Sequence, residues 1–405
     1  MATDTSQQRS AAPVRGLSHA APLTGLRAVA IVLVVLFVAL RGAGLGRGGW
    51  VGLDVFFVLS GFLITTTLLD EVEQTGSFSL GAFYLRRVLR LWPAYLVFLA
   101  GMAGYARLAH RAEFGSWAHQ LLVALTFRSN LYSVDHPAHT GLGQLWTLST
   151  EAQFYLLWPL VLLACLRLKS RRAMLLVTGL GALASLVDSA VLTGRHASYQ
   201  RLFFAPDTNA AALLIGCALG IAFTAGYLDR LAPTRFARLF PVAFLAVLAL
   251  WTLTVSDHDV WQFAGAVQVL CLATGIAIVC LVLAPQTWLG RLLAMPIAVW
   301  LGALSYSLYL WSVVALNAGP KAGHGLEDHV VHYGVQLLLL VELPVVSYYL
   351  IERHGPPLWS RLRARGRAAP ATDEPTPIES TGLFDELVDM DGAASHGAQP
   401  QETYS

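Results

Sequence analysis

The sequence carries little charge for its length. Only 13% of its 405 residues are Asp, Glu, Lys or Arg, whereas about a quarter of the residues in a soluble globular protein are charged. Hydrophobic residues make up 56% of the chain, and the mean hydropathy is +0.57. This composition excludes an ordinary soluble protein and indicates a polytopic membrane protein. Because no basic domain or basic-aromatic surface is present, we expect no binding of nucleic acid.

Cysteine is also scarce. The four cysteines, which all lie in apolar runs, are Cys165, Cys217, Cys271 and Cys280. None has the spacing of metal ligands, so we expect small buried side chains and no metal site. The residues before Leu23 are polar and have no apolar core of their own, so no cleavable signal peptide is expected.

Long apolar runs are abundant. A run of about 17–25 apolar residues is long enough to cross a bilayer, and ten such runs begin near Leu23, Val51, Leu91, Gln153, Met174, Ala210, Leu239, Phe263, Pro296 and Tyr333. An eleventh run, Ala118–Val134, is interrupted by polar residues. With ten crossings, eighteen Lys and Arg residues fall on one side and eight on the other, and the richer side is expected to be cytoplasmic. We therefore predict an all-α bundle of about ten transmembrane helices, multi-pass in the cell membrane, with both termini in the cytoplasm.

Residues 368–405 differ from the rest of the chain. They are rich in Pro, Ala, Ser and Thr and contain eight of the 25 acidic residues. A segment of this composition has little to bury, so we expect a disordered acidic tail. Its one patterned piece, Leu383–Met390, is compatible with a short helix that binds a partner or with a solvated acidic stretch.

Polar residues inside membrane spans are expensive and therefore indicate function. Five sequence stretches carry them. They are "TGLRAVAIVL" with Arg27, "GWVGLDVFFVLSGFLI" with Asp54, "FYLRRVLRLWPAYL" with Arg86, Arg87 and Arg90, "LGQLWTLSTEAQFYLLWP" with Glu151 and Tyr155, and "LGALSYSLYLWS" with Tyr306 and Tyr309. The last span ends in "YYLIERHG".

Together and in this order, these stretches resemble the acyltransferase-3 family of ten-helix membrane proteins, which O-acylate envelope glycans and macrolides. The resemblance covers residues 23–356, after a cytoplasmic segment at 1–22. It implies an acyl-CoA donor on the cytoplasmic side and a lipophilic or glycan acceptor. Arg27, Arg86, Arg87 and Arg90 are then expected to bind the phosphates of coenzyme A, since guanidinium groups suit phosphate.

The sequence departs from the family at its proton-transfer positions. The family has histidine eleven residues after the first-helix arginine, where this chain has Val38. Gln144 and Ser312 stand at two further histidine positions, and Asn209 stands at an arginine position. Histidine is the side chain best suited to proton transfer near neutral pH. In its place we predict that Glu151 and Asp54 act as acid or base and that Tyr155 and Tyr306 donate hydrogen bonds, with His136 and His139 in a neighbouring loop.

Three functional hypotheses follow. The first is a membrane O-acyltransferase that modifies a lipophilic natural product, such as an antibiotic, or an envelope glycan. The second is an enzyme of another class on the same scaffold, for example a cyclase, dehydratase or isomerase of secondary metabolism. The third is a non-catalytic carrier of a lipid or metabolite, since a fold does not fix a function.

Overall fold

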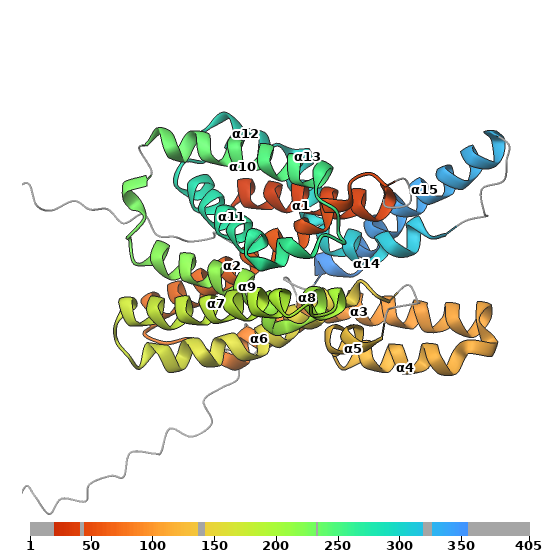
Figure 1. The fold of residues 1–405 in the computed structure, drawn as a ribbon, viewed down its shortest axis with the longest axis horizontal. Helices are drawn as coiled ribbons and strands as arrows, with labels where there is room; N and C mark the ends of the chain where they lie inside the picture. The colour runs from red at the N-terminus through yellow and green to blue at the C-terminus, as the bar shows by residue number, and fades with distance from the viewer. Residues whose placement is uncertain (1–19, 41–43, 137–141, 232–233, 319–325, 355–405) are drawn as a thin grey trace, which may run out of the picture. The chain divides into compact units, whose positions relative to one another are not determined.

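The chain folds almost entirely into α-helices in the computed structural model, which describes residues 20–40, 44–136, 142–231, 234–318 and 326–354 (Figure 1). No strand occurs in these ranges. The helices are α1 (Ala21–Leu40), α2 (Gly52–Thr75), α3 (Leu80–Ala109), α4 (Phe114–Leu125), α5 (Ser129–Asp135), α6 (Leu145–Leu166), α7 (Arg171–Gly194), α8 (Tyr199–Phe204), α9 (Pro206–Thr224), α10 (Arg235–Thr254), α11 (Ala266–Leu283), α12 (Trp288–Leu293), α13 (Pro296–Ala303), α14 (Ser305–Leu316) and α15 (Leu326–Leu350). Five short 3-10 turns join them: η3 (Arg47–Val51), η4 (Arg111–Glu113), η5 (Asp229–Leu231), η6 (Val260–Ala264) and η7 (Glu352–His354).

The prediction of an all-α protein with many membrane-spanning helices is confirmed. Within the described residues, nine helical segments are long and apolar enough to span a bilayer, and α13 with α14, which meet at a bend of 67°, make ten if the pair counts as one span. The interrupted run Ala118–Val134 does not form a span, because it is divided between the two short helices α4 and α5. The sides on which the termini lie, the domain limits and the acidic tail stay predictions, and the tail falls outside the described residues.

Several helices begin at a hydroxyl side chain. Ser79 and Ser170 precede α3 and α7, and Thr234 precedes α10; each accepts a hydrogen bond from a backbone N–H in the first turn. Such a cap satisfies a donor that has no partner within the helix. At the other end of α2, Gly76 adopts a φ of 79°, which glycine tolerates best. The sequence therefore sets these boundaries locally.

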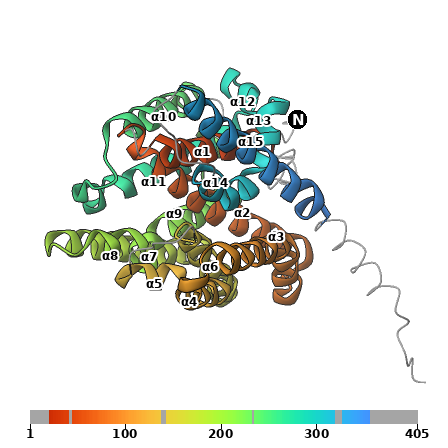
Figure 2. The ribbon, with the colours of Figure 1, turned by 90° about the vertical axis from the view of Figure 1, so that its right-hand side faces the viewer.

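Helix α2 lies at the centre of the described part and is the most buried span. It contacts α1, α6, α9 and α11, as the two ribbon views show (Figures 1 and 2). The crossing of α2 and α9 depends on glycine, since a Cβ added at Gly61 would lie 2.0 Å from the carbonyl oxygen of Leu213. Gly216 makes the reciprocal approach to Val58, at 2.2 Å. Small residues allow two backbones to approach closely in a membrane protein.

Close contacts at glycine also hold helix α1 against α12 and α13. A Cβ at Gly25 would lie 1.9 Å from the carbonyl oxygen of Leu293, and one at Gly302 would lie 1.9 Å from that of Thr24. The outer helices α7 and α15 instead expose most of their apolar residues. This arrangement suits a protein whose outer face contacts lipid and whose central helices carry the polar side chains.

Candidate active site

A group of charged side chains gathers between α1, α3 and α6. Arg27 of α1 interacts electrostatically with Arg87 and Arg90 of α3 and with Glu151 of α6. Arg27, Arg87 and Glu151 are partly buried, whereas Arg90 is exposed. We call Arg27, Arg87, Arg90 and Glu151 the charged cluster. Arg27 therefore faces the protein interior and has a partner of opposite charge, as a charge within a span requires.

Glu151 is held by neighbours from two helices. The hydroxyl of Ser60 on α2 donates a 2.7 Å hydrogen bond to Oε1 of Glu151 and lies 3.3 Å from the hydroxyl of Tyr155. The guanidinium of Arg87 lies 4.9 Å from the centre of the Tyr155 ring, within cation–π range. Tyr155 follows Glu151 by one helical turn, so both face the same way. Ser60 was not among the predicted site residues, although it stands within a quoted motif.

A second carboxylate approaches the charged cluster from the end of the last span. Glu352 of η7 accepts a hydrogen bond from the hydroxyl of Ser307 on α14. It also interacts electrostatically with Arg90 and Arg27. The motif "YYLIERHG" contains this residue, but the sequence does not reveal that it meets arginines more than 250 positions earlier. Arg27 thus interacts with Glu151 of α6 and with Glu352 of η7, and Arg90 interacts with Glu352.

Two tyrosines fasten α14 to its neighbours. The hydroxyl of Tyr306 donates a 2.9 Å hydrogen bond to the carbonyl oxygen of Leu91 on α3. The hydroxyl of Tyr309 donates to the carbonyl oxygen of Gln144 and accepts a 2.6 Å hydrogen bond from Thr147. Tyr306 remains within electrostatic range of Glu151 and Glu352. With its proton engaged by a backbone carbonyl, Tyr306 serves here as a structural link beside the site.

Arg86 lies beside the charged cluster but has an acidic partner of its own. Its guanidinium forms a 3.0 Å ion pair with Glu71 of α2, and both side chains are partly buried. Arg86 and Arg90 are four residues apart, a spacing that favours one helix face. The structure places Arg90 near Arg27 and Glu352, whereas Arg86 links α3 to α2.

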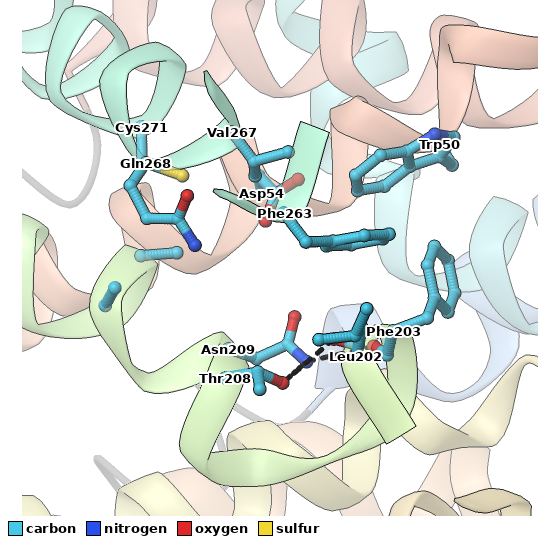
Figure 3. A pocket seen from close by; sticks show the side chains of 12 residues that line it. Trp50, Asp54, Leu202, Phe203, Thr208, Asn209, Phe263, Val267, Gln268 and Cys271 are labelled. Carbon is cyan, nitrogen blue, oxygen red and sulfur yellow. Dashed lines mark hydrogen bonds between the residues drawn. The ribbon is translucent and has the colours of Figure 1, made fainter. Parts of the chain in front are cut away.

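Asp54 lies away from Glu151, in a pocket between α2, α9 and α11 (Figure 3). It precedes Ser60 by six residues, so on a helix with 3.6 residues per turn the two side chains point about 120° apart. Its neighbours in the pocket include Asn209 and Gln268. The four residues predicted as catalytic are therefore not all brought together: Glu151 and Tyr155 adjoin, Tyr306 is near them, and Asp54 belongs to another pocket.

The positions that lack the family's histidines are used for packing. The Nε2 of Gln144 donates a 3.4 Å hydrogen bond to the carbonyl oxygen of Leu310, and Ser312 donates to the carbonyl oxygen of Tyr309. Val38 is partly buried near the end of α1. Among the loop histidines, His136 stacks on Tyr132 with ring centres 4.4 Å apart. His139 lies outside the described residues.

The position of Glu151 along the bundle differs from the expected arrangement. The predicted topology puts the arginines at the inner ends of their spans and Glu151 at the outer end of its own. The structure instead brings Glu151 into electrostatic contact with Arg27 and Arg87. Helices α1 and α6 pass the same level of the bundle, and neither residue stands in the first turn of its helix. The arginines and Glu151 therefore form one site, where the sequence predicted a basic region at one end of the spans and an acidic residue at the other.

Comparisons with known proteins agree with these motifs. Residues 22–324 match the family model of the acyltransferase-3 domain, described as "Acyltransferase domain". The chain is 30% identical over 347 residues to YrhL of Bacillus subtilis, whose assigned name is that of a peptidoglycan O-acetyltransferase, covering 82% of this chain and 54% of YrhL. It is 30% identical over 302 residues to the peptidoglycan O-acetyltransferase OatA of Listeria monocytogenes, covering 71% of this chain and 48% of OatA.

A Staphylococcus aureus protein (strain COL) that is named as an O-acetyltransferase is 27% identical over 342 residues, covering 82% of this chain and 56% of that protein. The chain therefore spans about half the length of the curated relatives it matches. No solved structure matches significantly.

Proposed function

Because this chain belongs to the acyltransferase-3 family, we propose that it is a membrane O-acyltransferase that uses an acyl-CoA donor and a hydroxyl of an envelope glycan as acceptor. The relatives named as peptidoglycan O-acetyltransferases support the glycan acceptor over a natural product. The observation that carries the proposal is the contact of Glu151 with Ser60 beside Arg27 and Arg87. An acid and several guanidinium groups meet there inside the membrane domain.

The reaction needs a base, a charge stabiliser and a route for a proton. In the proposed reaction the acceptor hydroxyl oxygen attacks the thioester carbonyl, and the Glu151 carboxylate takes the hydroxyl proton. The carbonyl oxygen becomes an oxyanion, which Arg27 and Arg87 stabilise by charge and hydrogen bonding. When the tetrahedral intermediate collapses, the carbon–sulfur bond breaks. The thiolate of coenzyme A leaves and takes up the proton from Glu151.

The arginines divide between two tasks in this proposal. Arg27 and Arg87 lie close enough to Glu151 to interact with it, which suits a role at the reacting carbonyl. Arg90 is more exposed and suits the phosphates of the acyl-CoA donor. Arg86 is joined to Glu71, so its contribution to donor binding is expected to be smaller than that of Arg90.

The decisive test uses the purified full chain in lipid nanodiscs with radiolabelled acetyl-CoA. Peptidoglycan fragments, lipid-linked glycan and a macrolide aglycone serve as separate acceptors. We expect label on a glycan, and a fall of about 10²–10⁴-fold in turnover for Glu151→Gln, the usual contribution of a general base. Glu113→Gln, which changes an exposed residue in η4, is the matched control.

The same assay separates the other two hypotheses. Conversion of an unlabelled acceptor without any donor would identify another enzyme class, and label on the macrolide alone would identify a natural product as the acceptor. Transport of an acceptor across proteoliposomes without chemical change would identify a carrier. Full activity in Glu151→Gln would refute the assignment of the base while leaving acyl transfer intact.

A further inference from the structure

A pocket between α2, α9 and α11 contains a buried carboxylate that the proposed reaction does not use. We propose that this pocket binds one monovalent cation about the size of a water molecule, with Asp54 as its charged ligand. The site would be separate from the charged cluster and would hold together three helices. It is independent of acyl transfer, and its test therefore rests on binding and stability.

The burial of the Asp54 carboxyl group is the first observation. Its side chain is only 5% exposed, and its Oδ2 has no hydrogen-bond partner. Among the described residues that line the pocket, none is basic. A carboxylate taken out of water without a counter-charge is costly, so such a group is protonated, paired with a basic side chain or bound to a metal ion. Since no basic side chain lines the pocket, a cation bound there would let Asp54 remain ionised.

The neighbouring polar groups offer oxygen atoms as well. Gln268 of α11 is 5% exposed, and its Oε1 also has no partner. Asn209 of α9 donates through Nδ2 to the carbonyl oxygens of Phe203 at 2.9 Å and Ala205 at 2.8 Å, which leaves its Oδ1 as an acceptor. Figure 3 shows Asn209 and Gln268 facing each other across the pocket, with Asp54 behind. Carboxylate and amide oxygens are the ligands of hard cations.

Size and charge restrict the ligand. The pocket has space for little more than one water-sized group, and the rings of Trp50, Phe203 and Phe263 close one side. A single carboxylate with neutral amides matches one positive charge. Within the described residues, no group of three acidic, His or Cys side chains exists to hold a divalent ion. A water molecule would supply hydrogen bonds but would leave the carboxylate charge uncompensated.

The test measures thermal unfolding of the full chain in nanodiscs in sodium, potassium or ammonium chloride. Choline chloride at equal ionic strength is the reference, because choline is too large for the pocket. We expect a saturable rise of about 2–4 °C in at least one of the small cations. Asp54→Asn removes the charge and should abolish the rise, whereas Asp70→Asn, on the same helix outside the pocket, should retain it. A response to ammonium alone would identify an ammonium group, rather than an alkali metal, as the source of the charge.

Equilibrium binding of radioactive sodium or rubidium provides the second measurement, with about one ion per chain expected for the wild type and none for Asp54→Asn. Asn209→Lys places an ammonium group on the opposite wall and should raise the melting temperature while removing the cation response. Equal melting temperatures in choline and in all small cations, with no ion bound, would overturn the proposal. An unchanged cation response in Asp54→Asn would overturn it as well.

Discussion

Replacing Gly61 by alanine should separate the two central helices and disturb the active site at once. The added Cβ would lie 2.0 Å from the carbonyl oxygen of Leu213, whereas ordinary contacts begin at 3.4 Å. The helices must therefore move apart by about 1.4 Å at this crossing, since backbone atoms on both sides cannot rotate away. Overpacking of this kind typically costs about 1–3 kcal/mol.

The displacement also affects the proposed catalytic residue Glu151, because its hydrogen-bond donor Ser60 directly precedes Gly61 on α2. Ser60 and Gly61 point about 100° apart on the helix, so a shift of α2 away from α9 would carry the Ser60 hydroxyl sideways past Glu151 and misalign their 2.7 Å hydrogen bond. We expect Gly61→Ala to lower the melting temperature by a few degrees and to lower turnover by at least tenfold, as small misplacements of catalytic groups do.

Thermal unfolding in nanodiscs and transfer of labelled acetyl groups measure the two effects. Gly179→Ala is the control, since a Cβ there meets nothing within 4 Å, and it should leave activity unchanged and stability equal or higher. The reasoning would be refuted if Gly61→Ala were as stable and as active as the control.

Three further substitutions test individual contacts. Ser60→Ala should lower turnover but leave the melting temperature nearly unchanged, because it removes the donor to Glu151. A fall in turnover that is accompanied by a marked fall in the melting temperature would indicate a structural role. Thr65→Val removes the buried acceptor of the 2.9 Å bond from Trp158 Nε1 and should cost about 1–3 kcal/mol in a denaturation series, and a neutral result would contradict it. Arg86→Gln should cost at most about 1 kcal/mol and raise KM for acetyl-CoA less than Arg90→Gln does, and the reverse order in steady-state kinetics would reverse their assigned roles.

The charged residues of the site were recognisable in the sequence as a set. Arg27, Arg87 and Glu151 stand out because a charged side chain within an apolar run is costly in free energy unless it has a partner. Such residues can be recognised from a single sequence. The partners themselves were not visible. Whether Glu151 meets Arg27 or stays at the opposite face depends on how α1 and α6 are placed side by side.

Asp54 and Ser60 are close in the sequence but belong to different sites in the structure. Asp54 stands in the same motif as Ser60, and it was predicted to act as an acid or base together with Glu151. The helical twist of α2 turns the two side chains toward different neighbours, one toward α6 and the other toward α11. Glu352 was visible only as part of a motif, since its approach to Arg90 depends on the position of the last span.

The sequence by itself determined that this is a membrane protein of about ten helices in the acyltransferase-3 family, because hydropathy and motif order are properties of the chain alone. Only the tertiary structure decided which polar residues meet, since hydrogen bonds and ion pairs act over a few ångströms and join helices far apart in the chain. Glycine contacts fix how closely α1 approaches α12 and α13 and how closely α2 approaches α9, and the packing of the helices places one carboxylate among the arginines and another in a pocket of its own.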